Sequence, residues 1–455
     1  MATDPVQEVN EFQRQTDLAT NVPQLLSRLA QLPPSTDAPY LTITLDWRPE
    51  GMQPGRRPAP EIRASDRRGG HEKPHPGPSW RPSWEEMHRD LADLVDSYEP
   101  HTPAHDSLAG DLDKFADFAK EIDEDAYGVL IVACSARNIF RTVPIGLPLP
   151  TRYHVGPTPA LLDLATAADD HPTYAALVAD QKEATLYIID WSEITGGVAL
   201  ESSGYPAHQK AGGWSNRRYQ DRADERVDAF AREIAEQVHR VMTEQGIERL
   251  IVAADEPIRT ALADAFPESV KGCLIDTINI STEANEESVI DQTLPIIDHD
   301  ERKREDDAVE NVRNNHGPGG TSVIGAQDTL TALQGGQVMS LVMNDDFSDK
   351  GWADFVQEVY GVGKPPKEHP YGGDVKNIVP VDLNQQFVRL ALQNDAEVQV
   401  VKTEVPVSVD EQVNIPDAGE PRPRAAAAKT LDEMGGVGAI LRFPVSAYQS
   451  TADLK

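Results

Sequence analysis

The most regular hydrophobic pattern of the chain begins at Tyr219. From there, apolar residues recur at steps of three and four positions, at Val227, Phe230, Ile234, Val238 and Val241. Side chains with this spacing share one face of an α-helix, so we predict an amphipathic helix of roughly 25 residues whose apolar stripe is buried.

Basic residues mark the start of the same predicted helix. Arg218, Arg222 and Arg226 are spaced four residues apart, so they lie on one face and form a basic ridge. Asp221, Asp224 and Glu225 partly offset this charge. The ridge is therefore either a surface for a phosphate backbone or a set of ion pairs within the helix.

Shorter patterns predict a multidomain α/β protein. Residues 1–125 combine helical stretches with the apolar run YLTITLDW at 40–47, which predicts an N-terminal α/β domain. Residues 126–294 contain short β-rich runs such as AYGVLIVACS and then alternate helices and strands, which predicts a central α/β domain. In residues 295–455 the alternation continues, and we predict a C-terminal α/β/α sandwich.

A loop at 51–81 interrupts the N-terminal domain. It is rich in glycine and proline, lacks periodicity, and carries seven basic residues against Glu61, Asp66 and Glu72. Its basic residues are Arg56, Arg57, Arg63, Arg67, Arg68, Lys73 and Arg81. The loop is either a solvated linker or an arm that follows RNA phosphates.

The whole chain is strongly acidic, with a formal net charge of −33 over 455 residues. Such a charge favours solubility and disfavours broad binding of nucleic acid, and we expect no DNA partner. The first residues lack the pattern of a signal peptide, and no apolar run reaches the roughly 18 residues of a membrane span. We therefore expect a cytoplasmic protein with no membrane contact.

Sequence motifs give no sign of a metal or cofactor. Cys134 and Cys273 form neither a CxxC pair nor a cluster with histidines, and there is no P-loop or Ser-His-Asp pattern. Asp255 and Glu256 follow an apolar run, where a capping or turn role outweighs metal binding, and His154 and His208 are interpreted as ordinary structural or loop histidines. We predict no metal and no cofactor.

The stretch KAGGWSNRRYQDR, residues 210–222, contains the chain's best candidate site. Gly212 and Gly213 allow close backbone approach, and the start of the following helix adds a partial positive charge. Together with the arginines, these features suit a phosphate backbone. The candidate RNA-binding residues are Lys210, Gly212, Gly213, Trp214, Ser215, Arg217, Arg218, Arg222 and Arg226, with Arg56, Arg57, Arg67 and Arg68 of the basic loop.

This motif resembles the catalytic loop of the archaeal and eukaryotic class-I release factor and Pelota superfamily, and more closely its Balon-like bacterial and archaeal relatives. Gly212, Gly213, Ser215, Arg218 and Tyr219 match the family pattern, whereas Trp214 stands where release factors have the glutamine of GGQ. The runs AQDTLTALQGGQVMSLVM, LNQQFVRLALQNDAEVQVV and EMGGVGAILRF resemble the family's third domain, so the likeness covers roughly residues 126–443.

The resemblance implies a ribosome-binding translation factor whose loop reaches the peptidyl transferase centre from the A site. It also implies contacts with rRNA and P-site tRNA, and a translational GTPase or ribosomal stalk bound to the C-terminal domain. The N-terminal domain shows no match to stop-codon-reading residues, so hibernation or rescue fits better than termination. A peptidyl-tRNA hydrolase acting on stalled ribosomes is the alternative, with Gly212, Gly213 and Trp214 as the loop candidates, and a non-ribosomal RNA-binding protein is the third.

A literal GGQ occurs elsewhere, at Gly335-Gly336-Gln337. It lies between a predicted helix and an apolar strand, where glycines commonly end a helix. We predict a structural role for it.

Overall fold

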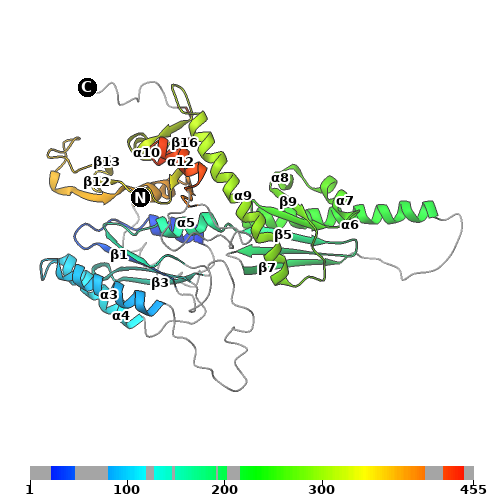
Figure 1. Cartoon of the computed structure of the whole chain (residues 1–455), viewed down its shortest axis with the longest axis horizontal. Helices are drawn as coiled ribbons and strands as arrows, with labels where there is room; N and C mark the ends of the chain where they lie inside the picture. The colour runs from blue at the N-terminus through cyan, green and yellow to red at the C-terminus, as the bar shows by residue number, and fades with distance from the viewer. Residues whose placement is uncertain are drawn as a thin grey trace, which may run out of the picture. The chain divides into compact units, whose positions relative to one another are not determined.

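The computed structural model describes residues 22–46, 80–118, 128–145, 149–190, 193–201, 216–404 and 424–444. The chain divides into two compact units: Met1–Asp169 with Glu305–Lys455, and Asp170–Arg304. Figure 1 shows sheets and helices in both units, so the predicted multidomain α/β fold class is confirmed. No helix within the described residues is long and apolar enough to cross a membrane.

The N-terminal sheet has the strand order β3-β2-β1-β4, and neighbouring strands are antiparallel. Leu41, Ile43 and Leu45 alternate along β1 and pack against a helical layer that includes Leu91 and Phe115. This alternation follows from the two-residue repeat of a strand, which turns every second side chain to the same face. The elements are β1 (Tyr40–Asp46), β2 (Gly128–Cys134), β3 (Ile139–Ile145), β4 (Arg152–Gly156), α3 (Trp80–Asp96) and α4 (Pro103–Phe118).

The first domain boundary differs from the predicted one at residue 126. β1 pairs with β2 on one side, where Ile43 faces Ile131, and with β4 on the other, where Ile43 faces Tyr153. Strands that were predicted for the central domain therefore complete the N-terminal sheet. The second compact unit ends at Arg304, ten residues beyond the predicted boundary at 294. Long-range strand pairing, which local patterns do not reveal, sets the first boundary, whereas the second falls within helix α9 (Glu286–Asn314).

The C-terminal part is an α/β/α sandwich, as predicted. Its mixed sheet has the order β10-β16-β11-β15. Val342, Val401 and Ile440 face a helical layer formed by α12 and the end of α9, and α10 and α11 contact the same strands as the second layer. The elements are α9 (Glu286–Asn314), β10 (Ser322–Ile324), α10 (Gly325–Gln334), β11 (Val338–Asn344), α11 (Leu383–Gln393), β15 (Glu397–Val401), α12 (Ala426–Glu433) and β16 (Val437–Leu441).

The segment between β11 and α11 forms a small antiparallel sheet of its own, with the order β13-β12-β14. Its strands are β12 (Lys350–Asp354), β13 (Val359–Val362) and β14 (Ile378–Asp382). Local patterns did not predict these strands, because glycine and proline dominate the segment.

The second unit, Asp170–Arg304, is a five-stranded sheet between two helical layers, with the order β7-β6-β5-β8-β9. Leu177 of β5 packs against the layer that contains α6 and α7, whereas Ala176 and Val178 pack against α9. The elements are β5 (Tyr174–Ala179), β6 (Glu183–Asp190), β7 (Glu193–Glu201), α6 (Asn216–Gln245), β8 (Leu250–Ala254), α7 (Ile258–Ala265), α8 (Glu268–Lys271) and β9 (Leu274–Ile278).

Candidate RNA-contacting site

The glycine-tryptophan motif lies on the connection between β7 and α6. β7 ends at Glu201 and α6 begins at Asn216, and Lys210, Gly212, Gly213, Trp214 and Ser215 fall outside the described residues. Because β7 is antiparallel to β6, and β6 to β5, Glu201 lies at the carboxyl end of β5. The connection therefore starts at the end of the sheet where the parallel strands β5 and β8 also finish.

Helix α6 confirms the predicted amphipathic helix. Its stripe residues Val227, Phe230, Ile234, Val238 and Val241 are all buried in one core with β5, β6 and β8. Figure 1 shows that the first turns of α6 extend past the end of the sheet. The side chains that hold the helix in place thus begin at Val227, and the turns before it carry the candidate arginines.

The structure places the basic ridge on the projecting part of α6. Arg217, Arg218 and Arg222 belong to the described helix backbone, although the described side chains begin at Glu225. Arg226 is exposed, and so is Glu225 beside it. The four-residue spacing of Arg218, Arg222 and Arg226 on a continuous helix puts the three positions on one face. Arg56, Arg57, Arg67 and Arg68 lie outside the described residues.

Hydrogen bonds of Arg259 and Glu256 stabilise the same end of the sheet. Arg259 donates to the carbonyl of Ala254, at the end of β8, and to the side chain of Asn279, just after β9. Glu256 accepts from the Thr260 hydroxyl at 2.8 Å, which supports a turn role for Asp255-Glu256. Within the described residues, no group of three or more His, Cys, Asp or Glu residues could hold a metal ion.

The literal GGQ at Gly335-Gly336-Gln337 ends a helix, as predicted. α10 stops at Gln334, Gly336 has a φ of +62°, and the Gln337 amide donates to the Ala332 carbonyl. A positive φ is accessible to glycine at little cost, so Gly336 turns the chain from α10 into β11.

A polar cavity that the sequence patterns did not predict lies in the first unit. Its volume is about 300 Å³, and segments from both the N-terminal and C-terminal parts line it, among them Thr42, Thr44, Asp163, Lys350 and Asp382. The one local signal was the pair of threonines, which are 3% exposed inside the apolar strand β1. Polar side chains on a strand buried on both faces must find partners, so they indicate a polar contact.

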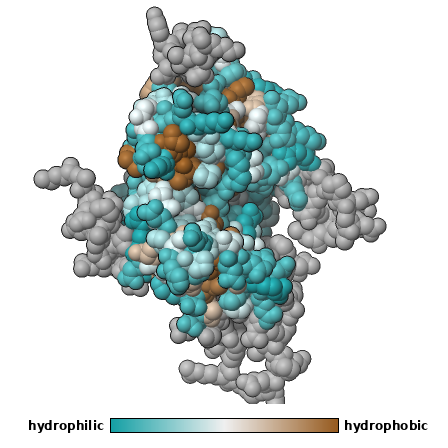
Figure 2. Space-filling view, turned by 90° about the vertical axis from the view of Figure 1, so that its left-hand side faces the viewer, coloured by the Kyte–Doolittle hydropathy of each residue, from teal (hydrophilic) through white to brown (hydrophobic). Residues whose placement is uncertain are grey.

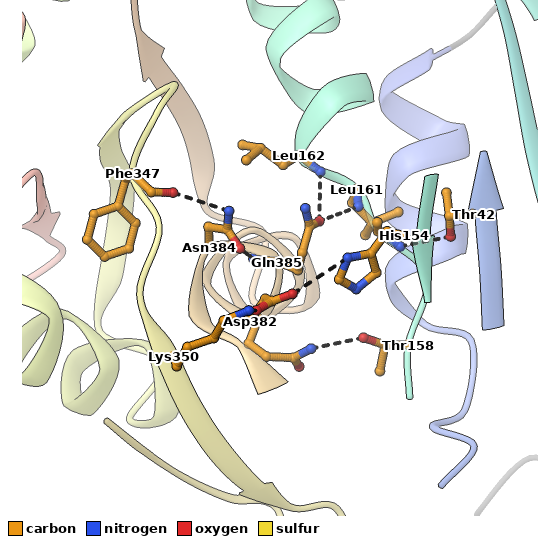
Figure 3. Close-up of polar contacts among 12 residues, drawn as sticks. Thr42, His154, Thr158, Leu161, Leu162, Phe347, Lys350, Asp382, Asn384 and Gln385 are labelled. Atoms are coloured by element: carbon orange, nitrogen blue, oxygen red, sulfur yellow. Dashed lines mark hydrogen bonds and ion pairs between the residues drawn. The ribbon is translucent and has the colours of Figure 1, made fainter. Parts of the chain in front are cut away.

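The polar side chains around this cavity are joined to one another and to the backbone by hydrogen bonds and ion pairs (Figure 3). Asp382 pairs with Lys350 and lies 3.6 Å from Nδ1 of His154. Burial lowers the pKa of His154, although the Asp382 carboxylate opposes this effect. Gln385 Oε1 accepts from the amides of Leu161 and Leu162, at 2.8 and 3.1 Å. These contacts join the N-terminal and C-terminal parts, and His154 takes part in them.

Comparison with known proteins identifies a related family for the central segment. Residues 159–298 match the sequence profile of bacterial archaeo-eukaryotic release factor family 10. This range contains β7, α6 and the connection between them. The predicted resemblance to the release factor superfamily is therefore confirmed over this segment, which is less than half of the chain. No curated protein matches the sequence.

Solved structures with some likeness include three proteins of translation. An archaeal translation termination factor, aRF1, is 13% identical, with 93% of this chain and 97% of that chain covered and a TM-score of 0.21. Ribosome-bound archaeal Pelota, in a model with ABCE1, is 13% identical, with 94% and 95% covered and a TM-score of 0.35. Dom34 of S. cerevisiae is 10% identical, with 72% and 85% covered and a TM-score of 0.34. TM-scores this low do not establish a shared overall arrangement.

Proposed function

We propose that the chain is a ribosome-binding translation factor of the cytoplasm that enters the A site. In this proposal, the loop with Gly212, Gly213 and Trp214 reaches the peptidyl transferase centre. The observation that supports it most is the family match over residues 159–298, which spans this loop and the helix behind it. The geometry of α6 agrees with such a role, because the loop is carried on helical turns that project past the sheet.

The arginine positions supply the attraction to RNA. Phosphate contacts need positive charge, and the projecting turns of α6 carry Arg217, Arg218, Arg222 and Arg226 in a chain of net charge −33. The basic loop 51–81 adds a second source of positive charge. An acidic body with two local basic segments limits binding to random RNA and favours one docking orientation.

Trp214 favours occupation of the centre over hydrolysis. A glutamine can offer both a donor and an acceptor to an attacking water, whereas tryptophan has one indole N–H donor and no acceptor. An indole ring also stacks well on exposed bases, at about 1–3 kcal/mol for each stacked base. Ribosome hibernation or rescue, without stop-codon reading, is the role that fits these properties.

A peptidyl-tRNA hydrolase is the second candidate. The observation that favours it is Gly213, whose backbone amide can still donate to a developing oxyanion even with tryptophan in place of glutamine. A non-ribosomal RNA-binding protein with the same folds is the third candidate, and it differs from the other two in having no affinity for ribosomes.

We also propose that the C-terminal sandwich binds a translational GTPase or the ribosomal stalk. Among the structures compared above, Dom34 is a termination-like factor that interacts with Hbs1, and one Pelota is ribosome-bound with ABCE1. Here, Met339 and Phe443 are 49% and 52% exposed. They lie at the same end of the β11–β16 pair, where Val338 faces Leu441. Two large apolar side chains exposed at one end of a strand pair offer an apolar surface that a partner can cover.

Sedimentation with ribosomes from the same cells, at native salt, tests the proposal. Each ribosome fraction is also assayed for release of peptide from peptidyl-tRNA. We expect cosedimentation without release. Cosedimentation with release that is lost on Gly213→Ala would identify the hydrolase instead. A protein that remains in the supernatant at native salt would contradict both ribosomal roles and leave the third candidate.

A further inference from the structure

The polar cavity of the first unit is large enough for a small metabolite. Its volume of about 300 Å³ is at the lower end of the range that is typical of ligand pockets, and it is open to solvent. Thr42, Thr44 and His154, on β1 and β4, line one part of it. The connection from β11 to β12 and the start of α11 line another part. The proposed role in translation uses none of these residues, so the cavity is available for a separate ligand.

Four carboxylates and two side chains of lysine and arginine line this cavity, and the carboxylates lie deeper. The side chain of Asp163 is 19% exposed, whereas its partner Arg152 is 61% exposed. Asp382 is 29% exposed and its partner Lys350 is 78% exposed. Figure 3 shows the Lys350–Asp382 pair beside His154, and because burial lowers the pKa of His154, this imidazole is neutral at neutral pH. The inner part of the cavity therefore carries more negative than positive charge.

Asp345 contributes a carboxylate that has no partner among the described residues. Its Oδ1 is buried, and neither of its carboxylate oxygens accepts a hydrogen bond or makes an ion pair there. By contrast, the neighbouring Asp346 pairs with Arg424, with 2.7 Å between Oδ2 and Nη1. Desolvating a carboxylate that has no partner costs free energy, and a cation that pairs with it removes part of this cost. Asp345 therefore favours a ligand that brings positive charge into the cavity.

The charge of Asp163 is only partly compensated by Arg152. Nη1 of Arg152 lies 3.4 Å from Oδ1 of Asp163, which is longer than the 2.7–2.9 Å or so of a strong charge-assisted hydrogen bond. Burial raises the pKa of Asp163, although Arg152 and the hydrogen bond from Thr44 oppose the shift. A further cation beside Asp163 would stabilise its charged form. Since Asp163 and Asp345 line the same cavity from separate segments, they favour a ligand with two positive charges.

We propose that the cavity binds a small aliphatic diamine. Its two ammonium groups would pair with Asp345 and Asp163, and the methylenes between them would contact Leu162 and Phe347, which also line the cavity. An anionic ligand fits less well, because carboxylates outnumber the basic side chains and each basic side chain already pairs with one of them. A metal ion fits less well too, since no group of three or more His, Cys, Asp or Glu residues in the described ranges could hold one. The proposal does not rest on ribosome binding.

Binding in the cavity has to be separated from the general attraction of amines to an acidic protein. The chain has a formal net charge of −33, and Figure 2 shows hydrophilic residues over most of the described surface on the face that it presents. Small cations associate loosely with such a surface, and salt screens this association. A test therefore needs native-like salt and a variant that loses the same charge at a different place.

Isothermal titration calorimetry of the full-length protein at about 0.15 M salt tests this proposal. The probe is diaminobutane, which carries an ammonium group at each end of a four-carbon chain. We expect saturable binding at one site, which Asp345→Asn weakens about tenfold because it removes a partly buried charge partner. Ala160→Leu, which fills part of the cavity without a change of charge, should weaken binding as well. Asp328→Asn, at an exposed position of α10, removes the same charge elsewhere and should leave the affinity unchanged.

Probes of matched length give a second test that needs only the native protein. Butylamine, with one ammonium group, should bind more weakly than diaminobutane, and uncharged butanediol should not bind. The proposal is overturned if diaminobutane shows no saturable binding up to about 10 mM, or if Asp345→Asn and Asp328→Asn bind it equally well. It is also overturned if succinate, the dianion of the same length, or magnesium chloride alone binds at this cavity while diaminobutane does not. Thermal unfolding of each variant at the native temperature would show that a loss of binding is not a loss of fold.

Discussion

Asp111 is a carboxylate that the fold buries with few polar partners. It lies on α4 and is 0% exposed. Ser135 donates to its Oδ1 at 2.6 Å, whereas Oδ2 is buried and has no hydrogen-bond partner within the described residues. Burial raises the pKa of Asp111 to about 6, although the bond from Ser135 opposes the shift. The charged form is therefore destabilised in the folded protein.

Asp111→Asn should stabilise the protein more at neutral pH than in mild acid. A carboxyl whose pKa is raised on folding contributes most stability when it is protonated, and this contribution is lost as pH rises through its folded pKa. With a shift from 3.8 to about 6, and about 1.4 kcal/mol for each pKa unit, the gain at about pH 7.5 approaches an upper limit of about 3 kcal/mol. Urea unfolding at about pH 7.5 and about pH 5 measures it.

The exposed residue Asp113, two positions along the same helix, provides the control for this prediction. Asp113→Asn should change the free energy of unfolding little at either pH, because its carboxylate is solvated in both folded and unfolded chains. If Asp111→Asn changed stability equally at the two pH values, ionisation of Asp111 would not be the cause.

At the scale of single elements, local periodicity predicted the helix that supports the candidate site. The apolar spacing that begins at Val227 identified α6, because the buried face of a helix against a sheet repeats every three to four residues. The same logic identified β1 as a strand from YLTITLDW. Gly335 and Gly336 were recognised as a helix end, because the tendency of glycine to end a helix also depends only on neighbouring residues. These features need no knowledge of distant residues.

Long-range contacts could not be predicted in the same way. β1 pairs with β2 across more than 80 residues of sequence, and nothing in either strand specifies that partner or the register. The polar contacts around Gln385 and His154 could not be predicted for the same reason, since the residues that line this cavity come from four separate segments. Buried threonines on β1 hinted at a polar contact, but a strand pattern does not say what a polar residue meets.

Charge reversal at Arg218 and Arg222 tests the candidate site on α6. The two positions lie on the projecting turns, before the buried stripe, so Arg218→Glu/Arg222→Glu should leave the fold intact. Under the proposed function it should weaken ribosome cosedimentation at least tenfold and flatten its dependence on salt, because fewer counterions are released on binding. Sedimentation across a series of salt concentrations measures both effects.

Helix α6 also provides the matched control. Arg232 and Arg240 are exposed further along it, where they bond to Asp228 and Gln237 of the same helix. Arg232→Glu/Arg240→Glu changes the net charge by the same amount and should leave ribosome binding close to that of the native protein. Equal losses in the two double variants would show that net charge, rather than the ridge, controls the interaction.

Gln385 of α11 caps the start of another helix, α5 (Leu162–Asp170). Its side-chain oxygen accepts from the Leu161 and Leu162 amides, which belong to the group of N–H donors that a helix leaves unpaired at its start. Gln385→Met keeps the volume and removes the acceptor, so we expect a loss of about 1–2 kcal/mol in the free energy of unfolding. Gln292→Met, at an exposed position of α9, should cost little in the same urea measurement, and equal values for the two variants would contradict a capping role.

At the scale of the whole molecule, the second unit is an insertion into the first. The chain leaves the first unit at Asp169 and returns at Glu305. Both residues are tied to the last part of β15, the edge strand of the C-terminal sheet, and the residue after it. The carboxylate of Asp169 accepts from the Val400 amide at 2.7 Å, and that of Glu305 from the Lys402 amide at 3.3 Å. The two crossing points are therefore held at positions of the β15 segment that are two residues apart, Val400 and Lys402. The two carboxylates also accept from backbone amides at the edge of the sheet.

This geometry predicts that the first unit folds without the second. Replacing residues 170–304 with about eight glycine and serine residues can connect the crossing points, because an extended chain spans about 3.3 Å per residue. The shortened protein should keep a single cooperative urea transition, because the sheets of the first unit and the contacts around its cavity involve residues of that unit alone. Under the proposed function it should also lose peptidyl transferase contacts and cosediment weakly with ribosomes. A shortened chain without a cooperative transition would show that the part of α9 that is removed, residues 286–304, is required to hold the first unit together. The inserted unit would then contribute to the stability of the first.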